Sequence, residues 1–170
     1  MTLPARQPAR QASFAATAEE HLDDVYAYLV YLTRDRSLAE DLAADTFEKA
    51  LRLWKRFDPG RASARTWLCQ IARTTALDWF RAEERRRKRE ERAAVPDVSA
   101  DGGLSLGLSP ELEAALRELS AGEREVIALR ILLELDGDEA ARVLGISPTA
   151  VSTRLSRALK KLEEKVTVHV

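Results

Sequence analysis

The sequence predicts an all-α protein built from two small helical domains that a flexible linker joins. Apolar residues recur at three- and four-residue spacing along most of the chain, and no long alternating strand pattern occurs. Only 7 Gly and 6 Pro stand among 170 residues, while 32% of the chain is charged, which is typical of helical proteins. A stretch of small residues with a proline and paired glycines, 93–108, separates the helical segments into two groups. We therefore predict a disordered N-terminus over 1–13, domains over 14–92 and 109–170, and a linker between them.

The first two predicted helices follow the disordered N-terminus. Apolar residues at helical spacing begin at Phe14, and a polar turn over 33–36 ends this first helix. Ser37 is expected to cap a second helix over 38–56, because Glu40 stands three residues later in the capping-box position.

The second predicted helix is apolar over more than half of its circumference, whereas a surface helix needs a stripe of about 100°. Burial between two neighbouring helices would explain this wide arc. A second explanation is that the polar rim of the helix docks on another protein, and the two explanations are compatible. The rim carries Asp41, Asp45, Glu48 and Arg52.

A third helix is predicted over 64–92, capped by Ser63 at the end of a loop over 57–63 that contains Pro and Gly. Its last part, 81–92, holds seven basic and four acidic residues, a local charge of +3 on a chain of net charge −1. This run is either a solvent-exposed helical extension with ion pairs between its acidic and basic residues, or a segment that contacts the phosphates of a nucleic acid. Aromatic residues beside arginines also suit the stacking of unpaired bases.

The C-terminal domain is predicted to hold four helices, of which the last two form a helix-turn-helix. The first of the four starts at Ser109-Pro110, and the second opens with a capping box of Ser120 and Glu123. In a helix-turn-helix, the second helix can lie in a DNA major groove. The residues that cap and turn the last two helices are Asp136 with Glu139, Gly145, Ser147 and Pro148.

The second helix of this motif has two distinct sides. Its apolar side is formed by Val151, Leu155, Ala158, Leu159 and Leu162. Its polar side carries Thr149, Thr153, Ser156, Arg157 and Lys160, with Ser152, Arg154 and Lys161 flanking. Hydroxyl and guanidinium groups make hydrogen bonds to base edges and phosphates, so this side fits DNA recognition. An ordinary amphipathic helix with a basic C-terminal end would show the same pattern.

Composition argues against several other classes of protein. The net charge of −1 and a pI near 6.2 are unusual for a free-standing nucleic-acid binder. Cys69 is the only cysteine, which excludes an internal disulfide and fits a core thiol in a reducing compartment. His21 and His169 stand far apart and match no common zinc spacing, so we expect no metal and no cofactor.

Targeting and catalytic signatures are missing from the sequence as well. It shows no signal peptide and no segment of membrane-spanning length, which predicts a cytoplasmic protein without membrane insertion. It also lacks a glycine-rich phosphate loop and a nucleophile elbow, and its carboxylates lie on helix rims. We therefore expect neither an enzyme nor a small-molecule substrate.

Four segments of the chain carry a more specific pattern. They are AEDLAADTFEKALRLW (39–54), RFDPGRASARTWLCQIARTTALDWFR (56–81), LSAGEREVIALR (119–130) and LDGDEAARVLGISPTAVSTRLSRALKKL (135–162). Together they resemble a sigma factor of bacterial RNA polymerase, in the compact extracytoplasmic-function (ECF) group that keeps only the second and fourth conserved regions. A helix-turn-helix occurs in many regulators, and the two segments ahead of it make the resemblance specific.

The resemblance implies partners and residue roles. The partners would be bacterial core RNA polymerase, promoter DNA and an inhibitory anti-sigma factor. The residues implied for the polymerase contact are Asp41, Asp45, Glu48 and Arg52. Those implied for the −10 promoter element are Arg61, Ser63, Arg65, Trp67, Arg73, Thr74, Asp78 and Arg81. Those implied for the −35 element are Thr149, Ser152, Thr153, Arg154, Ser156, Arg157 and Lys160.

Two positions depart from the family pattern, and two other functions compete with it. Thr74 stands where the family often has Asn, and Ser152 stands where many members have a basic residue, so both promoter preferences are open. The first competing function is a stand-alone helix-turn-helix repressor, which would bind a palindromic duplex by itself as a dimer. The second is a helical adaptor that binds only protein. The match over 39–81 argues against both.

The polar side of the last helix yields a first prediction. Arg157→Ala should weaken binding to the favoured −35 sequence by about 1–3 kcal/mol, because a guanidinium that reads a base edge discriminates among sequences. Lys160→Ala should weaken binding more evenly, as expected for a phosphate contact. Binding isotherms of the polymerase holoenzyme on matched and scrambled −35 elements measure both effects. Equal loss for Arg157→Ala on the two DNAs would show that the wrong face was assigned.

Overall fold

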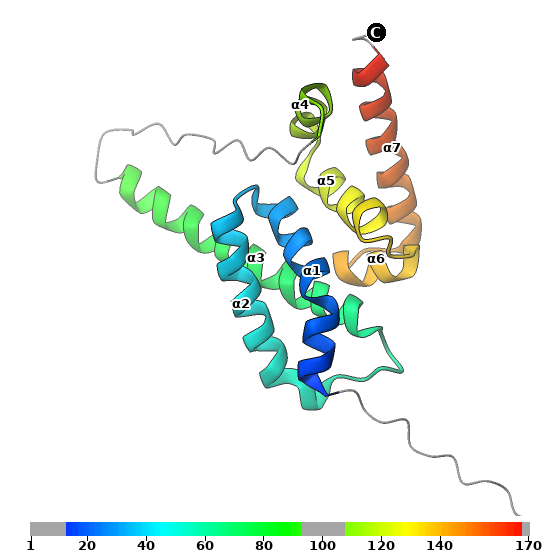
Figure 1. Ribbon diagram of the computed structural model, residues 1–170. Coiled ribbons are helices and arrows are strands. Elements are labelled where there is room, and N and C mark those ends of the chain that lie inside the picture. Colours follow the sequence, from blue (N-terminus) through cyan, green and yellow to red (C-terminus); the bar gives the residue numbers. More distant parts are fainter. Residues whose placement is uncertain (1–12, 93–107, 168–170) are drawn as a thin grey trace, which may run out of the picture.

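The computed structural model describes residues 13–92 and 108–167, and nearly all of the predicted disordered N-terminus and linker lie outside this part of the chain. The described residues form helices and connecting turns without a strand, which confirms the all-α prediction (Figure 1). Three helices come from the N-terminal half and the remainder from the C-terminal half. The side chains of 166–167 are not described.

The N-terminal half consists of α1 (Phe14–Thr33), α2 (Arg36–Leu53) and α3 (Ala64–Glu91), with a 3-10 turn, η1 (Trp54–Arg56), after α2. Ser63 caps α3 as predicted, since its side chain accepts a hydrogen bond from the Thr66 backbone N–H at 3.1 Å. The predicted cap of the second helix is wrong. Arg34 takes a left-handed conformation (φ 57°) that ends α1 at once, so Asp35 becomes the cap and accepts from the Leu38 N–H at 3.0 Å.

The C-terminal half contains α4 (Pro110–Glu118), α5 (Ala121–Ile127), a π-helical turn η2 (Ala128–Leu132), α6 (Gly137–Leu144) and α7 (Pro148–Thr167). Both capping boxes form, at Ser120 with Glu123 and at Asp136 with Glu139. Gly145 ends α6 with a φ of 67°, a conformation that costs glycine little, and the chain turns there into α7. The helix-turn-helix is therefore confirmed.

The wide apolar arc of α2 is explained largely by burial between α1 and α3, which both pack against it. Ala39, Leu42 and Ala50 are fully or almost fully buried on this side. Leu51 and Leu53 belong to the same predicted arc but are 57% and 38% exposed, and Leu53 lines a groove between α2 and α3. The bundle thus accounts for most of the arc and leaves two leucines at the surface.

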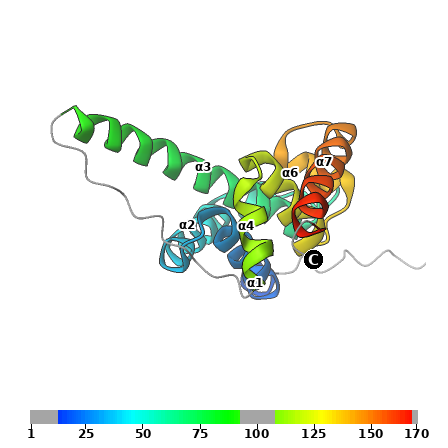
Figure 2. The same ribbon diagram turned by 90° about the horizontal axis from the view of Figure 1, so that it is seen from above.

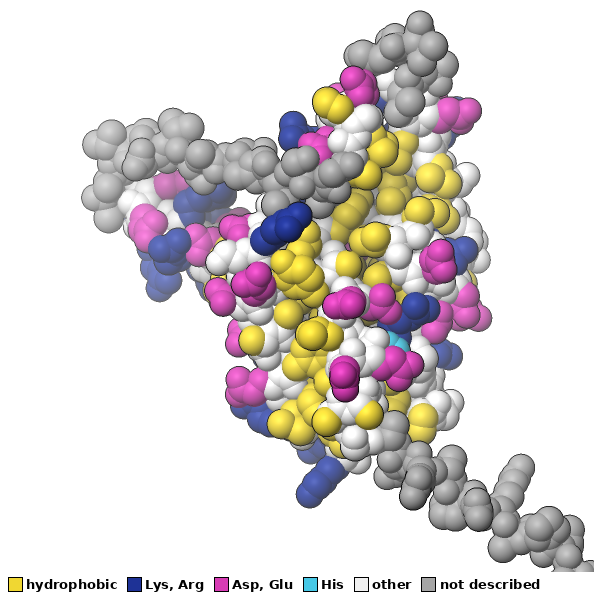
Figure 3. Space-filling view, viewed as in Figure 1, with side chains coloured by type: hydrophobic (Ala, Val, Ile, Leu, Met, Phe, Trp, Pro, Cys, Tyr) yellow, Lys and Arg dark blue, Asp and Glu magenta, His cyan; other side chains and the backbone are white. Residues whose placement is uncertain are grey.

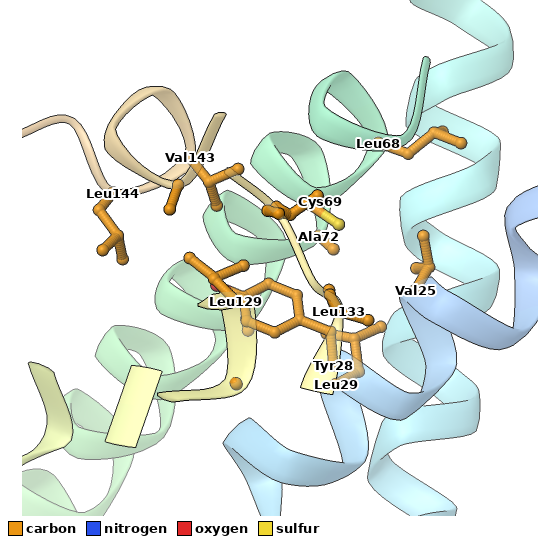
Figure 4. Close-up of a cluster of buried hydrophobic side chains, with 14 of the residues drawn as sticks. Val25, Tyr28, Leu29, Leu68, Cys69, Ala72, Leu129, Leu133, Val143 and Leu144 are labelled. Carbon is orange, nitrogen blue, oxygen red and sulfur yellow. The ribbon is translucent and has the colours of Figure 1, made fainter. Parts of the chain in front are cut away.

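The two halves pack against each other over one continuous cluster of buried side chains. Tyr28 and Leu29 of α1, Leu68 of α3, Leu129 of η2 and Val143 of α6 all belong to it (Figure 4). In chain order the halves are separate groups of helices, yet α6 lies along α3 and η2 lies against α1 (Figures 1 and 2). A second, smaller cluster joins α4, α5 and α7 within the C-terminal half.

Cys69 provides a probe of this packing. Its side chain is fully buried, and burial, with a smaller contribution from the charge of Asp24, raises the pKa of the thiol to about 12. At pH 8 the native protein should react with Ellman's reagent roughly 10³-fold more slowly than the unfolded chain, because the thiolate is the nucleophile. The absorbance of the thiolate released from the reagent measures both reaction rates. Rapid reaction of the native protein would contradict the buried position.

Candidate nucleic-acid interface

The polar side of α7 is open to solvent. Thr149, Ser152 and Thr153 are exposed near its start, and Ser156, Arg157 and Lys160 continue the face, so the predicted residues lie together on one helix. Ser147 accepts from the Ala150 N–H at 3.1 Å, which fixes the first turn of α7 and thereby the direction of this face. One residue of the predicted apolar side is misplaced. Leu159 is 43% exposed, since the neighbouring Ala158 makes the contact with α4 and α5.

A groove of about 520 Å³ runs beside this face, between the start of α5 and α7. Four of the predicted −35 residues line it, namely Thr149, Thr153, Arg154 and Arg157. Arg154 is half-buried and lies over Gly122, where an added Cβ would come within 3.1 Å of its Nη1 atom. Gly122 therefore leaves room for the guanidinium of Arg154 at the edge of the groove.

Glu123, one of the residues that line this groove, has a strongly lowered pKa. The Lys161 ammonium donates to the Glu123 carboxylate at 2.6 Å, and this bond, with the backbone N–H of Ser120, lowers the pKa of Glu123 to about 2. Glu123 consequently stays ionised and joined to Lys161 near neutral pH. The flanking Lys161 is thus held towards α5, while Arg157 and Lys160 remain on the open face.

A second groove, of about 430 Å³, lies between α2 and α3. It brings together the predicted −10 residues Trp67 and Thr74 with Arg52, a predicted polymerase-binding residue. Lys49 lines it as well and donates to the Thr75 hydroxyl at 3.2 Å. The remaining lining residues are Leu53, Gln70, Ile71 and Thr75. The site therefore combines two cations, one indole ring and several hydrogen-bonding groups, a combination that suits single-stranded nucleic acid.

Trp67 is held in place by an aromatic cluster below the groove. Its ring centroid lies 5.0 Å from that of Phe57 and 5.9 Å from that of Trp54, and Phe14 packs on Trp54 at 5.5 Å. Because these rings come from α1, η1 and the loop before α3, they fix the indole from several sides. A rigid aromatic side chain can support an unstacked base at little entropic cost.

The other predicted −10 residues do not all share this groove. Arg61 and Asp58 form a loose exposed pair at 3.8 Å, and Arg81 pairs with Asp78 at 3.5 Å farther along α3. Arg65 points to α1 instead, where its guanidinium lies 3.6 Å from Asp24. Arg61, Asp78 and Arg81 thus remain accessible at the surface, whereas Arg65 serves the packing of α3 on α1.

Arg73 reaches the C-terminal half, where it binds a buried carboxylate. Its Nε donates to Oε1 of Glu125 at 2.7 Å and its Nη2 donates to Oε2 at 3.3 Å. The fully buried Tyr28 hydroxyl donates to the same Oε1 at 3.0 Å. Burial raises the pKa of Tyr28 well above its ordinary value, and the charge of Glu125 adds to this. Burial lowers the pKa of Arg73, but the bond and the charge of Glu125 outweigh it and the net shift is upward.

Ser63 also binds the C-terminal half. The hydroxyls of Ser63 and Thr66 each lie 3.1 Å from Oε1 of Glu139, whose other oxygen caps α6 at the Asp136 N–H. The Gln70 amide donates to the Arg142 carbonyl at 3.0 Å. One edge of α3 is therefore covered by the C-terminal half. Two of the predicted −10 residues are engaged there, Ser63 by Glu139 of α6 and Arg73 by Glu125 of α5.

The predicted polymerase-binding residues lie on the solvent side of α2. Asp41 and Asp45 are exposed, and Glu48 pairs with Arg52 at 3.1 Å. A groove of about 380 Å³ between α1 and α2 lies on the same half of the molecule. Its lining joins apolar and acidic residues, which are Leu22, Asp23, Tyr26, Glu40, Ala43, Ala44 and Phe47. Acidic side chains surround exposed apolar surface in this area (Figure 3).

Sequence reasoning missed Lys49 and Gln70 in the α2–α3 groove. The helical period contained a signal for Gln70, which stands three residues after Trp67 and four before Thr74 on one face of α3. Lys49 belongs to another helix, so its place depends on how α2 packs. The acceptors Glu125 and Glu139 carried no local signal for their contacts with α3.

Within residues 13–92 and 108–167, no group of His, Cys, Asp and Glu side chains is placed to hold a metal ion. None of the helices in the described ranges combines the length and apolar character that crossing a membrane requires. What the described residues do offer is a helix-turn-helix with an open polar face and a helical half with a cationic, aromatic groove. This combination is that of a helical protein with two surfaces suited to nucleic acid.

Comparison with known proteins identifies the family. The family model for sigma-70 region 2 matches residues 17–86, and that for sigma-70 region 4 matches residues 109–162. The chain is 30% identical to the ECF RNA polymerase sigma factor SigX of Bacillus subtilis over 166 residues, which span 91% of this chain and 84% of SigX. It is 36% identical to the ECF sigma factor SigC of Mycobacterium tuberculosis over 138 residues, 79% of this chain and 73% of SigC. The chain belongs to the ECF group of the sigma-70 family, and it is not an enzyme.

Two solved structures resemble the whole arrangement. RpoE of Bartonella quintana, in complex with the anti-sigma factor NepR, superposes with a TM-score of 0.75 at 26% identity, covering 91% of this chain and 97% of that one. CnrH in complex with the cytosolic domain of CnrY gives a TM-score of 0.67 at 26% identity, covering 92% and 89%.

The contact between Arg73 and Glu125 yields a stability prediction. Glu125→Ala should lower the free energy of unfolding by about 1–3 kcal/mol, because a buried hydroxyl and a half-buried guanidinium lose their acceptor. Glu118→Ala is the matched control, since it removes an exposed carboxylate that pairs with Lys165 and should change stability by under about 1 kcal/mol. Urea denaturation measures both. Equal losses would show that Glu125 does not hold the two halves together.

Proposed function

We propose that this chain is an ECF sigma factor that binds bacterial core RNA polymerase, recognises the −10 and −35 promoter elements and directs transcription initiation. One observation carries the proposal. The region 2 and region 4 matches fall on two halves of the chain that each hold a surface suited to nucleic acid, the α2–α3 groove and the open face of α7.

The open face of α7 would read the −35 element in the major groove. Ser152, Ser156 and Arg157 are exposed there and can reach base edges, while Arg154 and Lys160 stand closer to phosphates. Ser152 places a small hydroxyl where many members of the family have a basic residue, and this hydroxyl donates to the Pro148 carbonyl at 3.2 Å. The groove beside α7 gives the DNA backbone space next to the helix.

The α2–α3 groove would hold the opened strand of the −10 element. Trp67 offers a stacking surface, and Lys49 with Arg52 supplies positive charge at the rim. Gln70 and Thr74 would provide hydrogen-bonding groups once their present bonds are exchanged. The Gln70 amide now donates to the Arg142 carbonyl at 3.0 Å, and the Thr74 hydroxyl donates to the Gln70 carbonyl at 2.9 Å. We assign Arg61, Asp78 and Arg81 to the margins of this site because all three are exposed.

The solvent side of α2 would bind the polymerase. Asp41, Asp45 and Glu48 form an acidic rim there, beside the exposed Leu51. An apolar centre with a charged rim is the usual composition of a protein interface. Because core polymerase acts in the bacterial cytoplasm, we place the protein there.

We further propose that an anti-sigma factor binds this chain in its packed arrangement. The arrangement resembles that of RpoE, which was solved in complex with the anti-sigma factor NepR, and that of CnrH in complex with the cytosolic domain of CnrY. In this arrangement Glu139 of α6 engages Ser63, and Glu125 of α5 engages Arg73. A partner that stabilises this packing would therefore keep part of the −10 surface away from DNA.

A stand-alone repressor is the second candidate function, and charge argues against it. A nearly neutral chain neutralises few phosphates by itself, and non-specific DNA affinity depends on that number. The region 2 match has no place in a repressor of this kind. Polymerase would supply the spacing of the two surfaces that the free chain does not impose.

Transcription with purified core polymerase tests the proposal. The chain alone should bind promoter duplex with micromolar or weaker affinity, a rough value in the non-specific range, and adding core should give promoter-specific transcripts. The double variant Asp41→Arg, Asp45→Arg should lose these transcripts. The control Glu19→Arg, Glu20→Arg makes the same change in net charge on α1 and should retain them. Tight binding to a palindromic duplex without polymerase, and no transcript with it, would favour the repressor.

A further inference from the structure

Glu123 places a carboxylate in the groove beside the open face of α7, where the proposed function gives an anion no task. Its side chain is only 10% exposed. The charged residues that line this groove are Glu123 and two cations of α7, Arg154 and Arg157. A free carboxylate there would repel the phosphates of an approaching duplex and attract the two arginines. The groove therefore fits DNA only if the charge of Glu123 is neutralised by another residue.

Lys161 neutralises this carboxylate from the far end of the groove. Its ammonium lies 2.6 Å from Oε1 of Glu123, while Oε2 accepts from the Ser120 backbone N–H at 2.9 Å. Both oxygens of the carboxylate are engaged in this way. Lys161 is not among the residues that line the groove, so the pair removes the negative charge and leaves both lining arginines positive.

The two arginines are the cations that would otherwise bind Glu123. Arg154, Arg157 and Lys161 follow each other at spacings of three and four residues, which places them on one side of α7. The Arg154 guanidinium lies over Gly122, the residue directly before Glu123. In the part of the chain that the structure describes, the Arg154 side chain has neither a hydrogen bond nor an ion pair. Arg154 thus lies beside an anion that Lys161 already occupies.

We propose that Lys161 is a positioning residue for −35 binding, which holds the Glu123 carboxylate so that the Arg154 guanidinium stays available to a DNA phosphate. The proposal rests on the proposed function, because α7 must meet DNA for Arg154 to be used. Lys161 makes no contact with DNA in this role. Without its ammonium, Glu123 would bind Arg154 instead, since a nearly buried carboxylate is costly unless a cation or further donors satisfy it.

The salt dependence of promoter binding tests this role. Holoenzyme with Lys161→Met is compared with wild type on a promoter selected in vitro from a randomised duplex library. Methionine keeps an unbranched side chain with a similar helix propensity and removes the charge. Loss of one phosphate contact should lower the slope of log affinity against log salt by about 0.9 in magnitude. The affinity should fall about tenfold at 0.1 M salt, and an unchanged slope would overturn the proposal.

Removal of the carboxylate should rescue the variant. Glutamine at position 123 can still accept from the Ser120 N–H, so Glu123→Gln keeps the capping box of α5. The double variant Lys161→Met, Glu123→Gln has no anion to bind Arg154, and it should regain the wild-type slope and the wild-type affinity within about twofold. If Lys161 contacted a phosphate directly, or only held α7 against α5, the double variant would bind as weakly as Lys161→Met and the proposal would be wrong.

Lys165→Met is the matched control. Lys165 lies one turn farther along α7 and also binds a carboxylate of a neighbouring helix, Glu118 of α4. Glu118 is 57% exposed and does not line the groove. This variant loses the same charge from the same helix, yet its slope should stay at the wild-type value. An equal fall for Lys165→Met and Lys161→Met would show a general charge effect and overturn the proposal.

A crystal structure of the free Lys161→Met chain locates the carboxylate without DNA. Glu123 should lie within about 4 Å of the Arg154 guanidinium, the distance of an ion pair. If Arg154 stays apart from Glu123, the proposal is wrong even where the affinity falls. Because this measurement needs no promoter, it is separate from a test of the proposed function. Failure of the wild-type chain to direct any promoter-specific transcript would remove that function, and with it the role of Arg154 at DNA.

Discussion

The position of the C-terminal half depends on one buried carboxylate. The Glu125 side chain is only 10% exposed, and a carboxylate removed from water is costly unless donors surround it. Tyr28 and Arg73 supply three hydrogen bonds from two different helices of the N-terminal half. Because these donors lie on α1 and α3, the carboxylate fixes α5 relative to both. The apolar packing around Leu129 and Val143 increases the area buried between the two halves, whereas the ion pair fixes their relative orientation.

The same hydrogen bonds of the packed arrangement engage residues that we assign to promoter binding. Arg73 and Ser63 belong to the residues that we assign to the −10 element, and both are engaged by the C-terminal half. The face of α7, in contrast, is exposed in the same arrangement. On the proposed assignment, binding of the −10 strand would compete with these internal contacts, while binding of the −35 element would not. A partner that binds either half can shift the equilibrium between the packed arrangement and the promoter-binding one. The size of the shift is set by the difference in the partner's affinity for these two states.

Local chemistry determined which features the sequence could predict. The helix-turn-helix follows from caps and a glycine that act within a few residues, and so do Ser63 and both capping boxes. Ser37 was the wrong cap because Arg34 took a left-handed conformation that the residue type does not favour. The second role of Glu139 could not be predicted from its capping box. Its contact with Ser63 joins residues 76 positions apart, so it depends on how the halves pack.

A chain with a net charge of −1 cannot depend on overall attraction to DNA, so its affinity must come from local surfaces. In the exposed C-terminal part of α3, seven basic and four acidic residues over 81–92 give such a surface a local charge of +3. The four acidic residues pair with Arg86, Arg87 and Lys88 along the helix, which stabilises it. A long exposed helix of this kind needs such pairs, because no neighbouring helix buries it. Since the pairs use all four acidic residues of 81–92, the net positive charge of this part of α3 comes from the arginines outside these pairs.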